Sequence, residues 1–134
     1  MKEIKYQKGR AWMELSMENL KHNIKEFRRI LPWDCALMPA VKANAYGHGA
    51  VLTANALQEQ GVQAFCVASV AEGAELRQSG IKGELLVLGY TAPSQFDDLI
   101  CYHLTQTVID GDYARQLERD GRRFTVHVGI DTGM

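Results

Sequence analysis

Five short apolar segments recur along the chain, and this recurrence is the feature that most limits what it can fold into. Their centres lie near residues 40, 66, 86, 106 and 127, and the segments are Ala36–Lys42, Ala64–Ala68, Glu84–Leu88, Leu104–Ile109 and Phe124–Ile130. Each is nearly continuous in hydrophobic residues, which is typical of a strand that is buried on both faces of a parallel sheet. The sequence therefore predicts five buried strands.

Segments with helix signals separate the predicted strands. Apolar residues recur at three- and four-residue steps behind Ser16, which predicts a helix over Met17–Leu31. Ser69 and Glu72 are predicted to form a capping box in front of a helix over 74–79, where each residue would bond the backbone N–H of the other. The remaining predicted helices are Ala50–Gln60, Ser94–Tyr102 and Asp112–Asp120.

Strands that alternate with helices predict an α/β protein with a parallel sheet and helices outside it. A doubly wound open sheet and a (β/α)₈ barrel both fit the spacing, which does not choose between them. A complete barrel needs roughly 200 residues or more, so a chain of 134 residues with about five βα units can be only part of one. Because the chain stops directly after a predicted strand, we expect residues 1–134 to be a partial domain of a longer protein.

Composition excludes several functional classes. The formal net charge of −1 gives no basic balance that would favour a nucleic-acid partner. Cys35, Cys66 and Cys101 form an odd set without CxxC spacing, so we predict neither a disulfide framework nor a metal site. No apolar stretch approaches the roughly 20 residues that span a bilayer, and Met1–Ile4 lacks the apolar core of a signal peptide. We expect a cytoplasmic protein.

The segment Pro39–Gly49 carries the chemistry. An apolar strand brings Lys42 to its C-terminal end, and a loop with two glycines and Tyr46 follows. The carboxyl ends of parallel strands form the active face of α/β folds, and a lysine held there can attack an aldehyde once it is neutral. In the alternative, Lys42 only extends its ammonium to solvent and the glycines serve as turn residues. Spacing alone favours that plainer alternative.

Residues 40–49 read AVKANAYGHG, and this string closely resembles the cofactor-lysine motif of the alanine racemase family. Several ordered motifs at suitable separations are far more specific than one motif alone. Three further segments resemble the family's opening strand and first helix, its third barrel strand, and the motif after its fifth strand; they are Arg10–Leu15 with Asn19–Asn23, Leu86–Gly89, and His127 with Asp131–Met134. The resemblance implies the N-terminal portion of a barrel that binds pyridoxal 5'-phosphate (PLP).

The resemblance also implies roles for individual residues. Lys42 would be the Schiff-base lysine and one of two catalytic bases, Tyr46 would hydrogen-bond the cofactor phosphate, and Leu88 would pack near the pyridine ring. The second base would be a tyrosine of a C-terminal β-domain that lies outside this sequence and reaches in from the partner of a homodimer. The implied activity is racemisation of a small amino acid, alanine or serine, which would feed D-amino acids to peptidoglycan precursors. Residues 1–134 alone are therefore expected to be inactive.

Gly129 departs from the family's pattern. In many alanine racemases this position, two residues before the Asp of the DTGM motif, holds a lysine that carries a carbamate. We therefore expect a water or a small anion such as chloride near Gly129 in the complete protein. The loss of the lysine also resembles the membrane-anchored serine/alanine racemases of vancomycin resistance. If that resemblance holds, Met1 is the cut edge of a larger, membrane-anchored protein whose cytoplasmic domain contains this chain.

Other functions and residues have weaker support. A non-catalytic PLP-binding carrier on a single barrel is the main alternative, but such proteins lack the AYGHG loop that follows Lys42; a plain interaction domain would bind no cofactor. His48 is expected to fix the turn rather than to assist a cofactor. The remaining charged candidates are interpreted as surface, structural or capping groups, and they are His22, His103, His127, Asp97, Asp98, Asp110, Asp112, Arg122 and Arg123.

Overall fold

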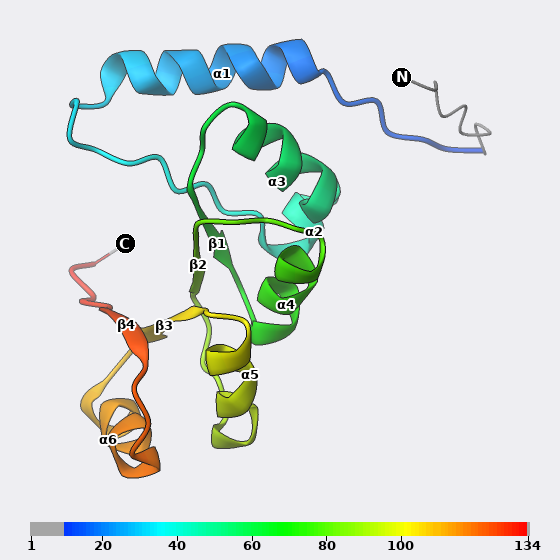
Figure 1. Cartoon of the computed structure of the whole chain (residues 1–134). Coiled ribbons are helices and arrows are strands. Elements are labelled where there is room, and N and C mark those ends of the chain that lie inside the picture. Colours follow the sequence, from blue (N-terminus) through cyan, green and yellow to red (C-terminus); the bar gives the residue numbers. More distant parts are fainter. Residues whose placement is uncertain (1–9, 134) are drawn as a thin grey trace.

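The computed structural model describes residues 10–133, so Met1 and Met134 lie outside the described residues. Four parallel strands form one sheet in the order β1-β2-β3-β4 (Figure 1). The strands are β1 (Ala64–Val67), β2 (Glu84–Val87), β3 (Thr105–Val108) and β4 (Thr125–Val128). The helices are α1 (Met17–Ile30), α2 (Lys42–Tyr46), α3 (Ala50–Glu59), α4 (Val70–Gln78), the short 3-10 helix η1 (Pro93–Gln95), α5 (Phe96–Cys101) and α6 (Gly111–Asp120).

The strand order distinguishes between the two architectures that the sequence left open. Every strand pairs in parallel with the next one along the chain, and the described sheet contains no reversal of order. A doubly wound sheet reverses its strand order at the switch point, whereas a barrel adds each strand on the same side of the last. The predicted α/β class is confirmed, and the order matches a consecutive segment of a barrel wall.

The core lies between the sheet and the helices on one of its faces. Phe65 and Val67 of β1 and Leu85 and Val87 of β2 face the helices, and none of these four side chains is exposed to solvent. Figure 1 shows α4 and α5 along this side of the strands. The other face carries the alternate residues, such as Cys66, which pairs with Leu86. The sheet is therefore covered by helices on one face, and the other face is the more open one.

The predicted strand Ala36–Lys42 is much shorter in the structure. Only Ala40 forms a bridge, to Cys66 of β1, with a hydrogen bond from the Val41 N–H to the Cys66 carbonyl at 2.9 Å. Lys42 already belongs to α2, so the segment pairs beside β1 for a few residues and then turns away. The opening strand expected over Arg10–Leu15 is irregular in the structure, since it has no neighbouring strand among the described residues to pair with.

Three helices begin at the polar residues that the sequence suggests. Ser16 accepts the Asn19 N–H at the start of α1, and Asp110 accepts the Tyr113 N–H at the start of α6. Helix α4 begins at Val70, earlier than the predicted 74–79, because Ser69 is its N-cap. None of the helices between residues 10 and 133 is both long enough and apolar enough to span a bilayer.

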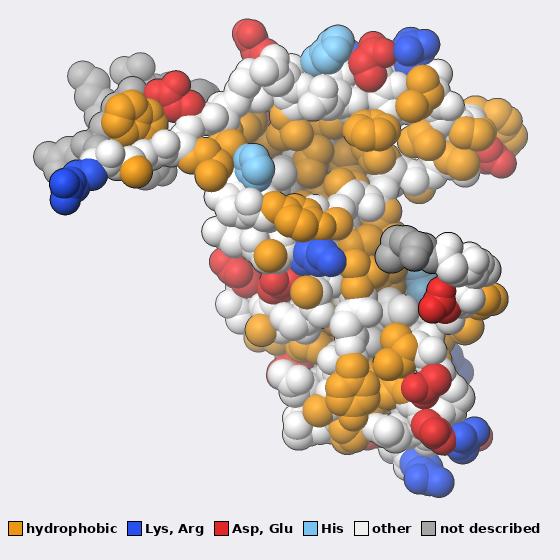
Figure 2. Space-filling model, turned by 180° about the vertical axis from the view of Figure 1, so that it is seen from behind, with side chains coloured by type: hydrophobic (Ala, Val, Ile, Leu, Met, Phe, Trp, Pro, Cys, Tyr) orange, Lys and Arg blue, Asp and Glu red, His pale blue; other side chains and the backbone are white. Residues whose placement is uncertain are grey.

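Helix α1 contacts α3 but is only partly packed against the rest of the molecule. Only Ile24 of this helix is buried, and Phe27 remains about half exposed at 51%. A groove of about 530 Å³ separates α1 from the segment 37–57. Figure 2 shows hydrophobic side chains gathered along this hollow below α1. The apolar spacing correctly predicted the helix, but only part of its apolar stripe is covered by the described residues.

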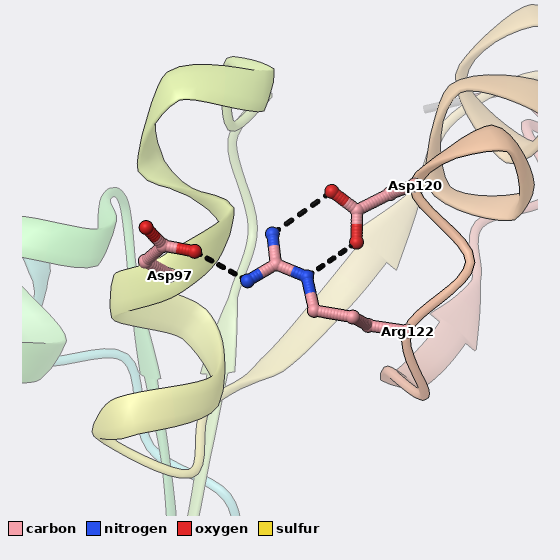
Figure 3. Close-up of polar contacts among 3 residues, drawn as sticks. All are labelled: Asp97, Asp120 and Arg122. Carbon is pink, nitrogen blue, oxygen red and sulfur yellow. Dashed lines mark hydrogen bonds and ion pairs between the residues drawn. The ribbon is translucent and has the colours of Figure 1, made fainter.

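Arg122 joins the end of α6 to helix α5 (Figure 3). Its guanidinium donates to both carboxylate oxygens of Asp120, at 2.5 and 2.8 Å, and also to Asp97. These carboxylates raise the pKa of Arg122, and the hydrogen bonds from Arg122 lower the pKa of Asp120. Arg122, interpreted from the sequence as a surface or structural group, is therefore the centre of a three-residue ion cluster.

Candidate functional site

The backbone immediately after Lys42 turns in the left-handed sense. Ala43, Asn44 and Ala45 have φ, ψ angles of 50°, 48°, of 54°, 44° and of 51°, 47°, and Tyr46 follows with a φ of 54°. A residue with a Cβ costs roughly 1–2 kcal/mol in this conformation. Four such residues in succession are rare, and strain of this kind concentrates at functional sites. Glycines at 47 and 49, with φ of 91° and 89°, complete the turn.

Hydrogen bonds inside the segment hold the turn. The Asn44 carbonyl accepts the Gly47 and Gly49 N–H groups at 3.1 and 2.9 Å. The Asn44 side-chain oxygen accepts the N–H of Ala50, the first residue of α3, at 2.8 Å. The Nδ1 of His48 lies 2.9 Å from the Ala45 carbonyl, as expected for a histidine that fixes the turn. Asn44 is thus the main internal support of the loop, a role that no sequence pattern indicated.

Glu72 connects this turn to the end of β1. Its Oε1 accepts the Ala43 N–H at 2.8 Å, and its Oε2 accepts the Ala68 N–H at 2.7 Å. The predicted capping box is only half present: Ser69 accepts the Glu72 N–H at 3.4 Å, but the Glu72 carboxylate bonds Ala68 and Ala43 instead of the Ser69 N–H. Hydrogen bonds to a charged group contribute roughly 1.5–3 kcal/mol each, which is comparable to the strain of one or two left-handed residues.

The structure brings two of the three predicted site residues to one edge of the sheet. Lys42 is partly buried and follows the bridge to β1. Leu88 follows β2, where its N–H donates to the Val67 carbonyl at 2.9 Å, and it is 37% exposed. Both therefore lie at the carboxyl ends of the strands. Tyr46, within the left-handed turn, is 62% exposed, so its phenol is open to a ligand or a partner.

Cys66 is the other potential nucleophile beside Lys42. Burial raises the pKa of the Cys66 thiol, and the charge of Glu84 raises it further, against a smaller opposing effect of Lys42. A thiol is a nucleophile only as the thiolate, so the net effect keeps Cys66 in its unreactive form.

A buried polar network supports the loop after Leu88. Gln106 of β3 donates to the Gly89 carbonyl at 2.8 Å and accepts the Thr91 hydroxyl at 2.6 Å. Tyr113 of α6 donates to the Thr91 carbonyl at 3.1 Å, and burial raises the pKa of its phenol. A Cβ on Gly89 would lie 2.5 Å from the Ala68 carbonyl oxygen, so only glycine fits there. The network fixes the chain next to Leu88, and no sequence pattern indicated it.

Gly129 directly follows β4 and lies beside the end of β3. Gly129 donates its N–H to the Val108 carbonyl at 2.9 Å. A Cβ at Gly129 would lie 3.4 Å from the Thr107 methyl, and the buried Thr107 hydroxyl has no hydrogen-bond partner among the described residues. His127 of β4 contacts Glu84 of β2, with 3.1 Å between Nε2 and Oε1. The anion expected at Gly129 stays a prediction.

Three kinds of comparison with known proteins all find similarity to the same family. A family model described as "Alanine racemase, N-terminal domain" matches residues 15–134. The chain is 43% identical over 128 residues to an alanine racemase of Carboxydothermus hydrogenoformans, and 41% identical over 125 residues to a serine/alanine racemase of Enterococcus gallinarum. The matches cover 92% and 93% of this chain but only 34% and 18% of those two proteins.

Solved structures show the same pattern of coverage. The crystal structure of alanine racemase from E. faecalis matches with a TM-score of 0.82 at 33% identity, over 88% of this chain and 33% of that one. Alanine racemase of Clostridium difficile, in complex with cycloserine, matches with a TM-score of 0.79 at 38% identity, over 87% and 32% of the two chains. The chain thus spans about a third of the length of the alanine racemases that it matches.

Proposed function

Because this chain belongs to the alanine racemase family, whose N-terminal domain model matches residues 15–134, we propose that it supplies the lysine-bearing part of a PLP-dependent amino-acid racemase. The substrate is a small amino acid, alanine or serine, whose L and D forms are interconverted for use in peptidoglycan precursors. The complete enzyme is a homodimer joined through sequence beyond residues 1–134. The observation that supports this proposal best is the position of Lys42, at the carboxyl edge of the sheet and directly before a strained turn.

Lys42 and Leu88 at this edge, and Tyr46 in the turn that follows Lys42, suit the chemistry of PLP. The cofactor is an aldehyde with an aromatic ring and a phosphate, and when it is bound it makes the α-proton of an amino acid acidic by delocalising charge into its ring. Lys42 offers a primary amine for the aldehyde, the exposed Tyr46 phenol offers a donor for the phosphate, and Leu88 offers an apolar side chain for the ring. The donor set therefore fits the group.

Within the proposed enzyme, the residues at and around Lys42 have separate tasks. Lys42 would hold the cofactor through its ε-amine and would remove or return a proton on one face of the substrate. Inversion requires a second acid–base group on the opposite face, which we assign to a tyrosine outside this sequence. Asn44 and Glu72 maintain the turn that places Lys42.

Covalent labelling tests the proposal directly. The complete polypeptide that carries residues 1–134 is mixed with PLP, reduced with borohydride and mapped by peptide mass spectrometry. We expect the reduced adduct on Lys42, and its loss in Lys42→Ala. Racemase activity should fall by about 10²–10⁴-fold or more, the usual contribution of one positioned acid–base group. Lys82→Ala, at an exposed lysine of the loop before β2, is the matched control. A folded parent protein without an adduct on Lys42 would overturn the proposal.

A further inference from the structure

We propose that Glu72 is a positioning residue for Lys42, and that it acts by fixing the first peptide of the left-handed turn against the end of β1. This inference rests on the proposed function. Glu72 lies in the first turn of α4, far from Lys42 in sequence, and the hydrogen bond from Ala43 to Glu72 spans 29 residues. The N–H that it holds belongs to the residue directly after Lys42, so the contact restrains the backbone that carries the amine.

The two oxygens of Glu72 have separate partners. Oε2 accepts the Ala68 N–H at 2.7 Å, which ties the carboxylate to the residue after β1. Oε1 accepts the Ala43 N–H at 2.8 Å. One side chain therefore links three elements: helix α4, strand β1 and the turn after Lys42. Both distances are short, as expected for hydrogen bonds from N–H groups to a charged acceptor.

A purely local capping role does not explain this geometry. In a capping box the acid at the third helical position bonds the N–H of the N-cap residue, which is Ser69 here. Glu72 bonds the preceding residue instead and directs its other oxygen out of the helix to Ala43. The contact is also placed where rigidity has most effect, because Ala43 begins the run of left-handed residues. Loss of the acceptor would free this peptide to leave the left-handed region and move Lys42 with it.

The test compares Glu72→Gln and Glu72→Ala with Glu75→Ala in the complete polypeptide. Glu75 is an exposed acid on the same helix. Its side chain forms no hydrogen bond or ion pair with the residues that the structure describes. The first readout is amide hydrogen exchange without cofactor. Exchange at Ala43 and Ala68 should accelerate about tenfold or more in Glu72→Ala, the factor expected when a hydrogen bond to a charged group is lost. Glu75→Ala should leave both amides unchanged.

The second readout is the rate at which PLP forms a borohydride-trapped adduct on Lys42, measured well below the unfolding temperature. We expect about a tenfold decrease in Glu72→Ala. Glu72→Gln, which keeps one carbonyl acceptor and is the milder change for folding, should recover part of the rate. A structural role alone would lower the unfolding temperature and leave this rate unchanged.

The outcomes separate the two proposals. An adduct on Lys42 in the parent, together with an unchanged adduct rate in both Glu72 variants, overturns the positioning role and leaves the proposed function intact, whether or not Ala43 exchange changes. No adduct on Lys42 in the folded parent overturns the proposed function and the positioning role that rests on it.

Discussion

Ala43, Asn44, Ala45 and Tyr46 keep a left-handed backbone although none of them is glycine. Asparagine tolerates this conformation better than alanine does, since its short polar side chain can bond locally, and Asn44 uses its side chain in that way. The alanines have no such compensation of their own. Ala45 is buried at 5% exposure, so packing supports it, whereas Ala43 is exposed and depends on its N–H bond to Glu72.

Substitution of Ala43 by glycine should therefore behave unlike an ordinary helical substitution. Glycine relieves roughly 1–2 kcal/mol of left-handed strain, against about 0.4–1 kcal/mol for the greater entropy of the unfolded chain. We expect Ala43→Gly to leave the free energy of unfolding unchanged or to raise it by up to about 1.5 kcal/mol, measured by urea denaturation. Ala114→Gly, at an exposed position in the right-handed helix α6, should lower it by about 1 kcal/mol. Equal losses in the two variants would contradict the strain.

The sequence alone predicted Lys42 as a site residue, but it did not indicate the residues that hold the turn after it. The motif around Lys42 resembles a known family, so it could be recognised from a short string. The contacts of Glu72 and Gln106 depend on how helices and strands that are distant in sequence pack together. The capping pattern at Ser69 and Glu72 correctly indicated a helix, although α4 begins at Val70, before the predicted range of 74–79. It could not show that the carboxylate also reaches Ala43, because that distance exists only in the folded chain.

At the scale of elements, backbone carbonyls after α4 and α5 accept hydrogen bonds from one side chain, Arg77. The Arg77 guanidinium donates to the carbonyls of Ile81 and Gly83 after α4, and of Tyr102 and His103 after α5, at 2.8–3.0 Å. Burial lowers the pKa of Arg77, yet the side chain stays charged at all ordinary pH values. A planar group with five donors suits this arrangement, which a lysine could not reproduce. Arg77 therefore fixes α4, the helix that presents Glu72.

The ion cluster of Arg122 leads to a prediction about pH. The pKa of Asp120 is lowered in the folded chain by its hydrogen bonds with Arg122. A lowered pKa means that the stabilisation is present above the unfolded value, near 3.9, and is lost as the pH falls through the folded value. Asp120→Asn should therefore lower the unfolding temperature slightly at pH 7, and this effect should be smaller near pH 2, below the unfolded value.

Two controls make this experiment specific to the ion cluster. Asp34 is an exposed acid whose side chain forms no hydrogen bond or ion pair with the described residues. Asp34→Asn should therefore leave the unfolding temperature unchanged at both pH values. The effect of Asp120→Asn should also shrink in about 1 M salt, where exposed charges are screened within roughly 3 Å. A loss of stability of the same size at pH 2 and at pH 7 would show that the Arg122 cluster does not act through charge.

Element boundaries were predicted best where a capping residue marks them. Ser16 and Asp110 indicated the starts of α1 and α6, and Gly121 marks the end of α6 in the left-handed conformation. The strand predicted over Ala36–Lys42 was wrong in extent, because hydrophobicity does not show how many residues find a partner. Only Ala40 pairs with β1 in the described chain, and the left-handed turn then takes over.

At the scale of the whole molecule, burial decreases along the sheet. Residues of β1, β2 and β3 that face the helices are almost fully covered, whereas the equivalent residues of β4, Val126 and Val128, are 40% and 71% exposed. Ile130, which follows β4, is 78% exposed. Helix α6 contacts β3, so within residues 10–133 no helix after β4 covers its valines. A βα barrel covers each strand with the helix that follows it, so these side chains mark where the next unit would pack.

Residues 1–134 prepared alone should therefore associate through this uncovered part of the sheet. Exposed apolar side chains next to an unpaired strand edge promote pairing between chains. A charge within the patch should oppose that association, so we expect Val128→Lys to lower the mean mass measured by light scattering toward that of the monomer. Ser79→Lys adds the same charge at an exposed helix end far from β4 in the sequence, and it should leave the mass unchanged. If both lysine variants reduced the mass equally, net charge rather than the β4 surface would control association.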